Sequence, residues 1–122
     1  MKGMTFMTNQ VNILPMIALR GTTVLPEMIV HFDVSREKSI RAVEAAMLHD
    51  QKVFLLTQKD PEVETPELDD LYRVGTIAYI KQVVKLPQDL YRVLVEGLDR
   101  AEILSLEQEE PSLKAECEIV TA

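Results

Sequence analysis

Residues 13–57 read ILPMIALRGTTVLPEMIVHFDVSREKSIRAVEAAMLHDQKVFLLT. This stretch contains two apolar runs, then an amphipathic segment, then a third apolar run. The apolar runs occupy residues 13–19, 28–34 and 53–57. Short aliphatic and β-branched runs of this kind are typical of strands, and the third reads as a fully buried strand. We therefore expect a β-turn-β-α-β unit around which the rest of the chain is arranged.

The amphipathic segment predicts one long helix. Ile40, Val43 and Met47 recur at spacings of three and four residues and form an apolar stripe. Ser35 is a residue type that caps helix N-termini, because its side-chain oxygen accepts a hydrogen bond from an amide of the first turn. We expect the helix to begin after Ser35 and to end near residues 49–50.

The second half of the chain predicts further strands. They lie at residues 74–86, at 91–98 with a continuation at 100–106 beyond a kink, and at 113–120, with a hairpin turn at 86–89. Gly75 is expected to mark a bulge or a close backbone contact, and Gly97 a kink. Six strands, many of them apolar on both faces, need more cover than one helix provides. They predict an α+β, mainly β fold in which a strongly bent sheet closes into a small barrel with the helix packed against it.

The net charge of −7 is concentrated in two connecting segments. Residues 58–70 carry one lysine and six acidic residues, and residues 107–118 carry one lysine and five. We expect the first of these to be a solvated surface loop, with a short helical turn near residues 67–71. The sequence has no basic stripe for a nucleic-acid backbone, so nucleic-acid binding is not expected.

The single cysteine, Cys117, excludes an internal disulfide. It lies in phase with the apolar residues of the last strand, so we expect it to be buried and unreactive. No apolar segment reaches the length of a membrane span, and the N-terminus lacks the apolar core of a signal peptide. These features predict a cytoplasmic domain without a membrane partner.

No sequence motif points to catalysis. The four glycines are too far apart for a P-loop or a dinucleotide fingerprint, and no serine lies in a nucleophile elbow. His31 and His49 lie on different elements, without other ligand types at metal-binding spacing. The sequence therefore provides no catalytic, cofactor-binding or metal-binding residue, and it favours a binding or assembly module.

Three segments carry a resemblance to a known family. They are LPMIALRGTTVLPEMIVHFDVSREKSIRAVEAAM at 14–47, VGTIA at 74–78 and LPQDLYRVLVEGLDRA at 86–101. In this order they resemble the N-terminal, substrate-binding domain of Lon, the ATP-dependent protease. The resemblance implies a six-stranded, PUA-like pseudobarrel with one helix over residues 12–122. Residues 1–11 show no periodicity, and we expect them to be poorly ordered.

The resemblance also implies a function for the chain as part of a larger enzyme. Similar full-length proteins carry an ATPase module with a P-loop, which uses ATP and Mg²⁺, and a protease domain with a Ser-Lys dyad. Neither motif lies within these 122 residues, so no catalytic residue is carried over. The implied partners are unfolded or degron-bearing polypeptides and other copies of the chain, as a hexamer in the full-length protein and a weak dimer in this fragment. Two alternatives stay open: a free-standing adaptor of the same fold, and a small hydrolase with an unrecognised site.

Arg36, Glu37 and Lys38 are the first candidates for binding substrates or partners. They follow the predicted N-cap, where the partial positive charge of a helix terminus makes basic residues locally unfavourable. One interpretation is that this corner meets a polypeptide or a neighbouring domain. The other, of equal weight, is that the charges are exposed and screened by solvent. Under the first interpretation, reversing all three charges is expected to leave folding intact or slightly improved.

Leu25, Pro26 and Met28 are the second group of candidates. They lie in a proline-interrupted connector before the second strand. Exposed apolar residues that gather in one place mark contact surfaces. We expect this group to contact substrates or neighbouring copies of the chain.

Overall fold

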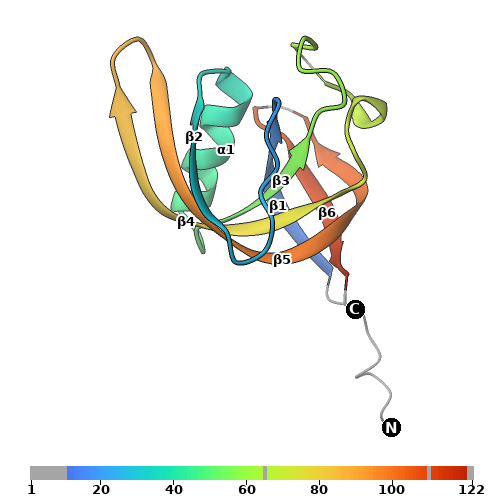
Figure 1. Ribbon diagram of the computed structural model, residues 1–122. Coiled ribbons are helices and arrows are strands. Elements are labelled where there is room, and N and C mark those ends of the chain that lie inside the picture. Colours follow the sequence, from blue (N-terminus) through green and yellow to red (C-terminus); the bar gives the residue numbers. More distant parts are fainter. Residues whose placement is uncertain (1–10, 65, 110, 121–122) are drawn as a thin grey trace, which may run out of the picture.

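A computed structural model describes residues 11–64, 66–109 and 111–120 (Figure 1). The strands are β1 (Val11–Leu19), β2 (Ile29–Val34), β3 (Lys52–Thr57), β4 (Val74–Leu86), β5 (Leu90–Gln108) and β6 (Lys114–Ile119). The helices are α1 (Glu37–Met47) and the short 3₁₀ helix η2 (Leu68–Asp70). The predicted mainly β class, with six strands and one long helix, is confirmed for the described residues.

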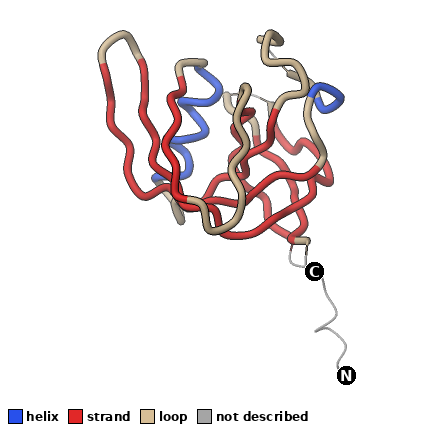
Figure 2. The backbone as a smooth tube through the Cα atoms, in the orientation of Figure 1, coloured by secondary structure: helices blue, strands red, loops and turns tan. Residues whose placement is uncertain are grey.

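The six strands form one sheet that closes through β5 (Figure 2). Their order is β2-β5-β4-β3-β1-β6, and β6 also pairs with the second half of β5. β1 and β3 are parallel, whereas every other pair is antiparallel. The predicted pseudobarrel is therefore a ring of β5, β4, β3, β1 and β6. β2 lies outside this ring and pairs with the first half of β5.

β1 and β3 form the centre of the fold because both of their faces are buried. The side chains of alternate residues pack in the core beneath α1, and those of the residues between them pack inside the barrel. The residues under α1 are Ile17 and Leu19 from β1 and Val53 and Leu55 from β3. The residues inside the barrel are Leu14, Met16, Ala18, Phe54 and Leu56. One helix is sufficient because it covers only the first core, and the closed sheet encloses the second (Figure 1).

The helix is shorter than predicted at both ends. Arg36 occupies the N-cap position, with extended backbone angles of φ −70° and ψ 139°, and no side chain caps the helix. The prediction of Ser35 as the N-cap is therefore wrong. The reason is that the Arg36 side chain is bonded to a strand and a loop, which holds this residue outside the first turn. The helix ends at Met47 with Leu48 as its C-cap, two residues before the predicted end.

Gly75 and Gly97 lie where two backbones approach closely. A Cβ atom at Gly75 would collide with the carbonyl oxygen of Leu55, and one at Gly97 would collide with that of Leu25. The close contact predicted at Gly75 is confirmed. The connector before β2 can cross β5 at Gly97 only because this residue has no side chain.

β5 is one long strand with a bulge (Leu90–Gln108), in agreement with the predicted strand at 91–98 that continues at 100–106. The register of β5 against β4 skips Leu98, which lies between the paired residues Gly97 and Asp99. A bulge adds one residue to a strand and bends it without ending it. The predicted kink at Gly97, with the strand continuing beyond it, is confirmed.

Two further predictions can be compared with the structure. Cys117 is fully buried, as predicted, and burial raises the pKa of its thiol to about 12. Residues 1–10 lie outside the described residues, and Val11 is the first residue of β1, where it pairs with Glu118. In the part of the chain that the structure describes, no helix is both long and apolar enough to cross a membrane.

Candidate functional site

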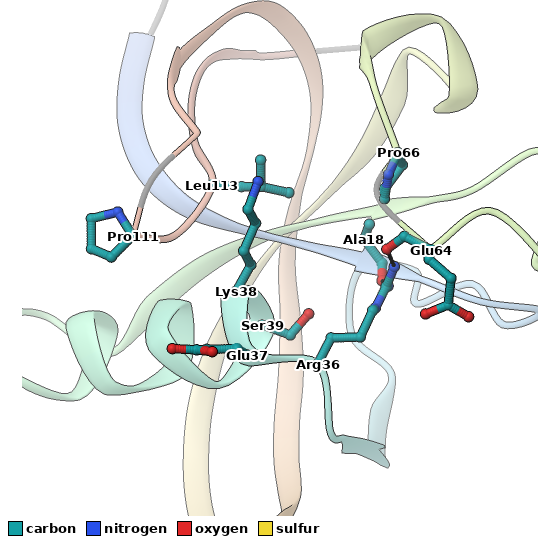
Figure 3. A pocket seen from close by; sticks show the side chains of 9 residues that line it. All are labelled: Ala18, Arg36, Glu37, Lys38, Ser39, Glu64, Pro66, Pro111 and Leu113. Atoms are coloured by element: carbon teal, nitrogen blue, oxygen red, sulfur yellow. Dashed lines mark hydrogen bonds between the residues drawn. The ribbon is translucent and has the colours of Figure 1, made fainter.

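A cleft of about 400 Å³ opens beside the N-terminus of α1 (Figure 3). It is bounded by the start of α1, the end of β1, the acidic loop between β3 and β4, and the turn before β6. Its lining residues are Ala18, Arg36, Glu37, Lys38, Ser39, Glu64, Pro66, Pro111 and Leu113. The structure thus places the three predicted charged residues at one cleft, which is called the charged cleft below.

Arg36 connects three sides of the charged cleft. Its guanidinium donates to the carbonyl oxygen of Ala18 at 2.6 Å and to that of Glu64 at 3.1 Å. Partial burial lowers the pKa of Arg36, and the positive charge of nearby Arg20 lowers it further. Because its donors are bound to β1 and to the acidic loop, Arg36 is a structural residue as well as a wall of the cleft (Figure 3).

Glu37 and Lys38 line the cleft from the first turn of α1. Glu37 is exposed and accepts a hydrogen bond from Arg41 at 3.3 Å. A carboxylate at the first helical residue interacts favourably with the helix dipole. Lys38 is half-buried and extends along the cleft toward Leu113 (Figure 3). The predicted dipole penalty therefore applies to Lys38 and not to Arg36, which precedes the first turn.

The acidic loop is held against the rest of the fold. The buried side chain of Gln58 donates to the carbonyl oxygens of Asp60 at 3.0 Å and Val63 at 2.9 Å. Arg20 forms an ion pair with Glu64 at 3.1 Å. Most acidic side chains of the loop are exposed, as predicted, but its backbone is held by the buried side chain of Gln58 at its start and by Arg36 from outside the loop.

The end of the same loop forms η2, which confirms the helical turn predicted near residues 67–71. Glu67 and Asp70 form a capping box, in which each side chain accepts from the backbone amide of the other. Leu71 follows directly and is buried in the barrel core. This end of the loop is therefore packed against the barrel core through Leu71, while Glu67 remains exposed.

Leu25, Pro26 and Met28 lie at the other end of β2. Leu25 is 45% exposed and Met28 is 37% exposed, and the adjoining Ile29 is 58% exposed. Their backbone is fixed by β5, because the amide of Gly97 donates to the carbonyl oxygen of Met28 at 2.8 Å. We call Leu25, Pro26, Met28 and Ile29 the apolar patch.

The structure does not bring the two predicted groups together. β2 spans Ile29–Val34, which corresponds to about 17 Å at about 3.3–3.4 Å per residue. The apolar patch adjoins the first residue of β2, and the charged cleft begins two residues after the last. The two groups are therefore the two ends of one elongated surface that follows β2.

Sequence reasoning missed the walls that complete the charged cleft. They are Ala18, Glu64, Pro66, Pro111 and Leu113. No sequence pattern relates these positions to residues 36–38, because they meet only when the barrel closes. Pro66 and Pro111 were visible in the sequence as turn residues, without any sign that they face the helix.

This surface combines exposed apolar side chains with charged ones. Among the described residues, no group of three or more His, Cys, Asp and Glu side chains is placed to hold a metal ion. Cys117, the one thiol of the chain, is buried in the barrel core and does not line the charged cleft. Exposed apolar groups at one end and paired charges at the other offer contacts to a polypeptide.

Comparison with known proteins identifies the family of this fold. The family model described as the ATP-dependent protease La (LON) substrate-binding domain matches residues 13–122. The chain belongs to this family. It is 58% identical over 103 residues to the Lon protease of Lachnoclostridium phytofermentans and 54% identical over 109 residues to that of Clostridium acetobutylicum. These regions cover 84% and 88% of the chain but only 13% and 14% of those proteins. The resemblance to Lon is thereby confirmed.

Two solved structures share the fold of this Lon-family chain. The N-terminal domain of Mycobacterium avium complex Lon protease has a TM-score of 0.67 and 21% identity, over 91% of this chain and 55% of that chain. The Lon N-terminal domain protein from Xanthomonas campestris has a TM-score of 0.63 and 12% identity, over 85% and 56%. At these identities the likeness shows the fold alone.

Proposed function

We propose that the chain is the substrate-recognition domain of an ATP-dependent Lon-type serine protease that degrades misfolded and regulatory proteins. Its substrates in this proposal are unfolded or degron-bearing polypeptides. Support comes from the family that the chain belongs to and from the elongated surface that follows β2.

One observation carries the proposal: the two ends of β2 differ in chemistry and lie about 17 Å apart. An unfolded polypeptide exposes apolar side chains that a folded protein buries. Leu25, Met28 and Ile29 offer exposed apolar contact area to such side chains. Arg36, Glu37 and Lys38 offer charges at the other end, where polar groups of the same polypeptide would bind.

In this proposal the chain binds but does not catalyse. ATP and Mg²⁺ would bind to an ATPase module, and peptide bonds would be cleaved by a Ser-Lys dyad, both elsewhere in the full-length enzyme. The chain would then contribute to the reaction by raising the concentration of unfolded substrate near the enzyme.

Assembly is a second part of the proposal. The same apolar patch would contact neighbouring copies, in a hexamer of the full-length enzyme and weakly in the isolated chain. Sedimentation of the chain at increasing concentration tests this part. A shift toward dimer that is lost when Leu25 and Met28 are both replaced by serine supports it, and a monomer at all concentrations contradicts it.

Binding to an unfolded protein tests the main proposal directly. The isolated chain is mixed with fluorescently labelled casein, which is largely unfolded, and with a labelled folded protein of similar size. We expect saturable binding to casein, little binding to the folded protein, and neither ATP hydrolysis nor casein cleavage. Equal binding to both proteins, no binding to casein, or turnover of ATP or casein by the pure chain would each contradict the proposal.

A further inference from the structure

β2 has one unpaired edge. It is the terminal strand of the sheet and pairs with β5 alone. Ile29, His31 and Asp33 are exposed, whereas Val34 is buried and Val30 and Phe32 are packed against the core beneath α1. This edge is the part of the elongated surface that connects the apolar patch to the charged cleft.

The register of β2 shows which backbone groups are unpaired at this edge. Antiparallel partners alternate between residues that exchange hydrogen bonds and residues whose N–H and C=O groups point away. The amide of Gly97 donates to Met28, so bonding to β5 continues at every second residue of β2 from there. Val30, Phe32 and Val34 are therefore bonded to β5. Ile29, His31 and Asp33 direct their N–H and C=O groups to the open edge.

The neighbouring strand gives the same alternation. The amide of Ile80 in β4 donates to the carbonyl oxygen of Gln51 at 2.7 Å, on the side away from β5. Ile80 is opposite Val95 of β5, so Val95 directs its backbone groups to β2 instead. Val95 is opposite Val30, which confirms that Val30 belongs to the bonded set.

The open edge lacks the usual protection against pairing with another strand. Proteins protect such edges with lysine, proline or bulges. β2 has the sequence IVHFDV, without lysine or proline, and its register against β5 is regular. Its one acidic residue, Asp33, is paired with Arg92 of β5, whose Nε and Nη2 atoms lie 2.9 and 3.1 Å from its two carboxylate oxygens. The charge of Asp33 is thereby directed onto the sheet and away from the edge.

There is also space beside the edge. A cleft of about 200 Å³ lies along the second half of β2 and continues to the start of α1. β2 contributes Phe32, Asp33 and Val34 to it, and the end of β1 and the following turn contribute Leu19, Arg20 and Thr22. The backbone of a polypeptide beside β2 would run through this second cleft toward Arg36.

We infer that the open edge of β2 binds an extended segment of unfolded polypeptide as an added β-strand. The inference rests on the proposed function and names how the substrate is held. The alternating donors and acceptors of these three residues match the backbone of an extended segment, and backbone hydrogen bonds are independent of the side chains of the bound segment. This mode of binding suits a domain whose substrates share no sequence. The proposed contacts between copies use the side chains of the apolar patch, and pairing of this edge with a second copy is the alternative outcome of the test.

Amide hydrogen exchange of the 122-residue chain, followed by NMR, tests the inference. The probe is a ten-residue peptide of alternating valine and threonine with a lysine at each end. In the free chain, the amides of Val30, Phe32 and Val34 should exchange slowly and those of Ile29, His31 and Asp33 fast. With saturating peptide, exchange of the three fast amides should slow by about tenfold or more. Each of these N–H groups would then donate a hydrogen bond to the peptide backbone or be shielded from water by it.

The outcomes separate this inference from the proposed function. If the chain binds neither casein nor the peptide, both fail. If casein or the peptide binds while the three amides keep exchanging fast, only the added strand is overturned. Protection of the same amides in the free chain that grows with protein concentration would also overturn it, since the edge would then pair with a second copy.

Matched variants test the edge by affinity. The double variant Ile29→Lys and His31→Lys places cations on the edge strand, and it should bind the peptide about tenfold more weakly. Leu94→Lys is the control, because Leu94 lies opposite His31 on β5, which is not an edge strand. Equal loss of affinity in the control and the double variant would show that the face of the sheet, and not its edge, binds the peptide.

Discussion

The two ends of β2 are held in different ways. At the charged cleft, the guanidinium of Arg36 binds two backbone carbonyl oxygens, so a residue predicted to meet a partner also holds β1 and the acidic loop together. At the apolar patch, the backbone is fixed against β5 while the side chains of Leu25 and Met28 remain exposed. A charged residue at a candidate site can therefore also hold the fold together, so that replacing it lowers stability as well as binding. An exposed apolar residue can be replaced with a smaller loss of stability.

The largest expected effect comes from the contact that fixes the apolar patch. Gly97→Ala places a Cβ atom against the carbonyl oxygen of Leu25, and backbone must move to accept it. We expect a loss of about 3 kcal/mol in the free energy of unfolding, measured by urea denaturation. Gly21→Ala is the control, since Gly21 has a φ of +69° but open space around it, and it should cost about 1 kcal/mol. Equal losses would show that the approach of Leu25 to β5 is unimportant.

The next effect sharpens the role of Arg36. Arg36→Met keeps much of the apolar stem and removes the donors to Ala18 and Glu64. We expect it to lower the free energy of unfolding by about 1–3 kcal/mol, because two partly buried carbonyl oxygens lose a charged partner. This replaces the sequence-based expectation that charge reversal at 36–38 leaves folding intact.

Arg41→Met is the matched control for that variant. Arg41 forms an exposed ion pair with Glu37 within α1, and such pairs contribute about 0.3–0.5 kcal/mol. Thermal unfolding of both variants, under the same buffer conditions, compares the two arginines. If Arg36→Met melts at the same temperature as Arg41→Met, Arg36 does not hold the cleft together.

The apolar patch should show the opposite behaviour. Replacing Leu25 and Met28 by serine together should lower the free energy of unfolding by only about 1 kcal/mol, since both side chains are more than a third exposed and the contact of the Leu25 amide with Met28 Sδ at 3.4 Å is weak. The affinity for unfolded casein should fall about five- to tenfold, as apolar contact area is lost. Leu48→Ser removes a side chain that is 82% exposed at the far end of α1, and it should leave the affinity unchanged. Similar losses in both would show nonspecific apolar binding.

The smallest expected effect concerns pH and the middle of β2. The hydrogen bonds from Arg92 lower the pKa of Asp33, although burial opposes the shift. A lowered pKa in the folded state means that this pair contributes stability above the unfolded pKa of about 4, and that the contribution is lost as the pH falls through the folded value. Asp33→Asn should therefore have a flatter dependence of stability on pH below about pH 4. An unchanged pH dependence would show that Arg92 does not stabilise the carboxylate.

The strands were predictable because their signals are local. The two-sided apolar runs of β1 and β3 indicate a doubly buried centre, and the sequence of α1 shows its stripe. The start of the helix was not predictable in the same way. Ser35 has the intrinsic preference for the N-cap, but the bonds of Arg36 to residues 18 and 28 positions away in sequence override it.

The site was predictable only in part, for the same physical reason. Residues 36–38 and the connector at 25–28 could be singled out from local charge and proline content. Their separation by the length of β2, and the walls that Glu64 and Leu113 add to the charged cleft, depend on contacts between distant parts of the chain. The open edge of β2 could not be foreseen at all, because strand order is a property of the closed sheet.

The central claim is that unfolded polypeptides bind along β2, from the apolar patch to the charged cleft. A titration of the ¹⁵N-labelled chain with a short unfolded peptide, followed by NMR, tests it most directly. The account predicts that the largest changes occur at Leu25, Met28 and Ile29 and at residues 36–38. Changes centred instead on the β4–β5 hairpin turn, or on the exposed Tyr72 and Val74 beyond η2, would contradict it.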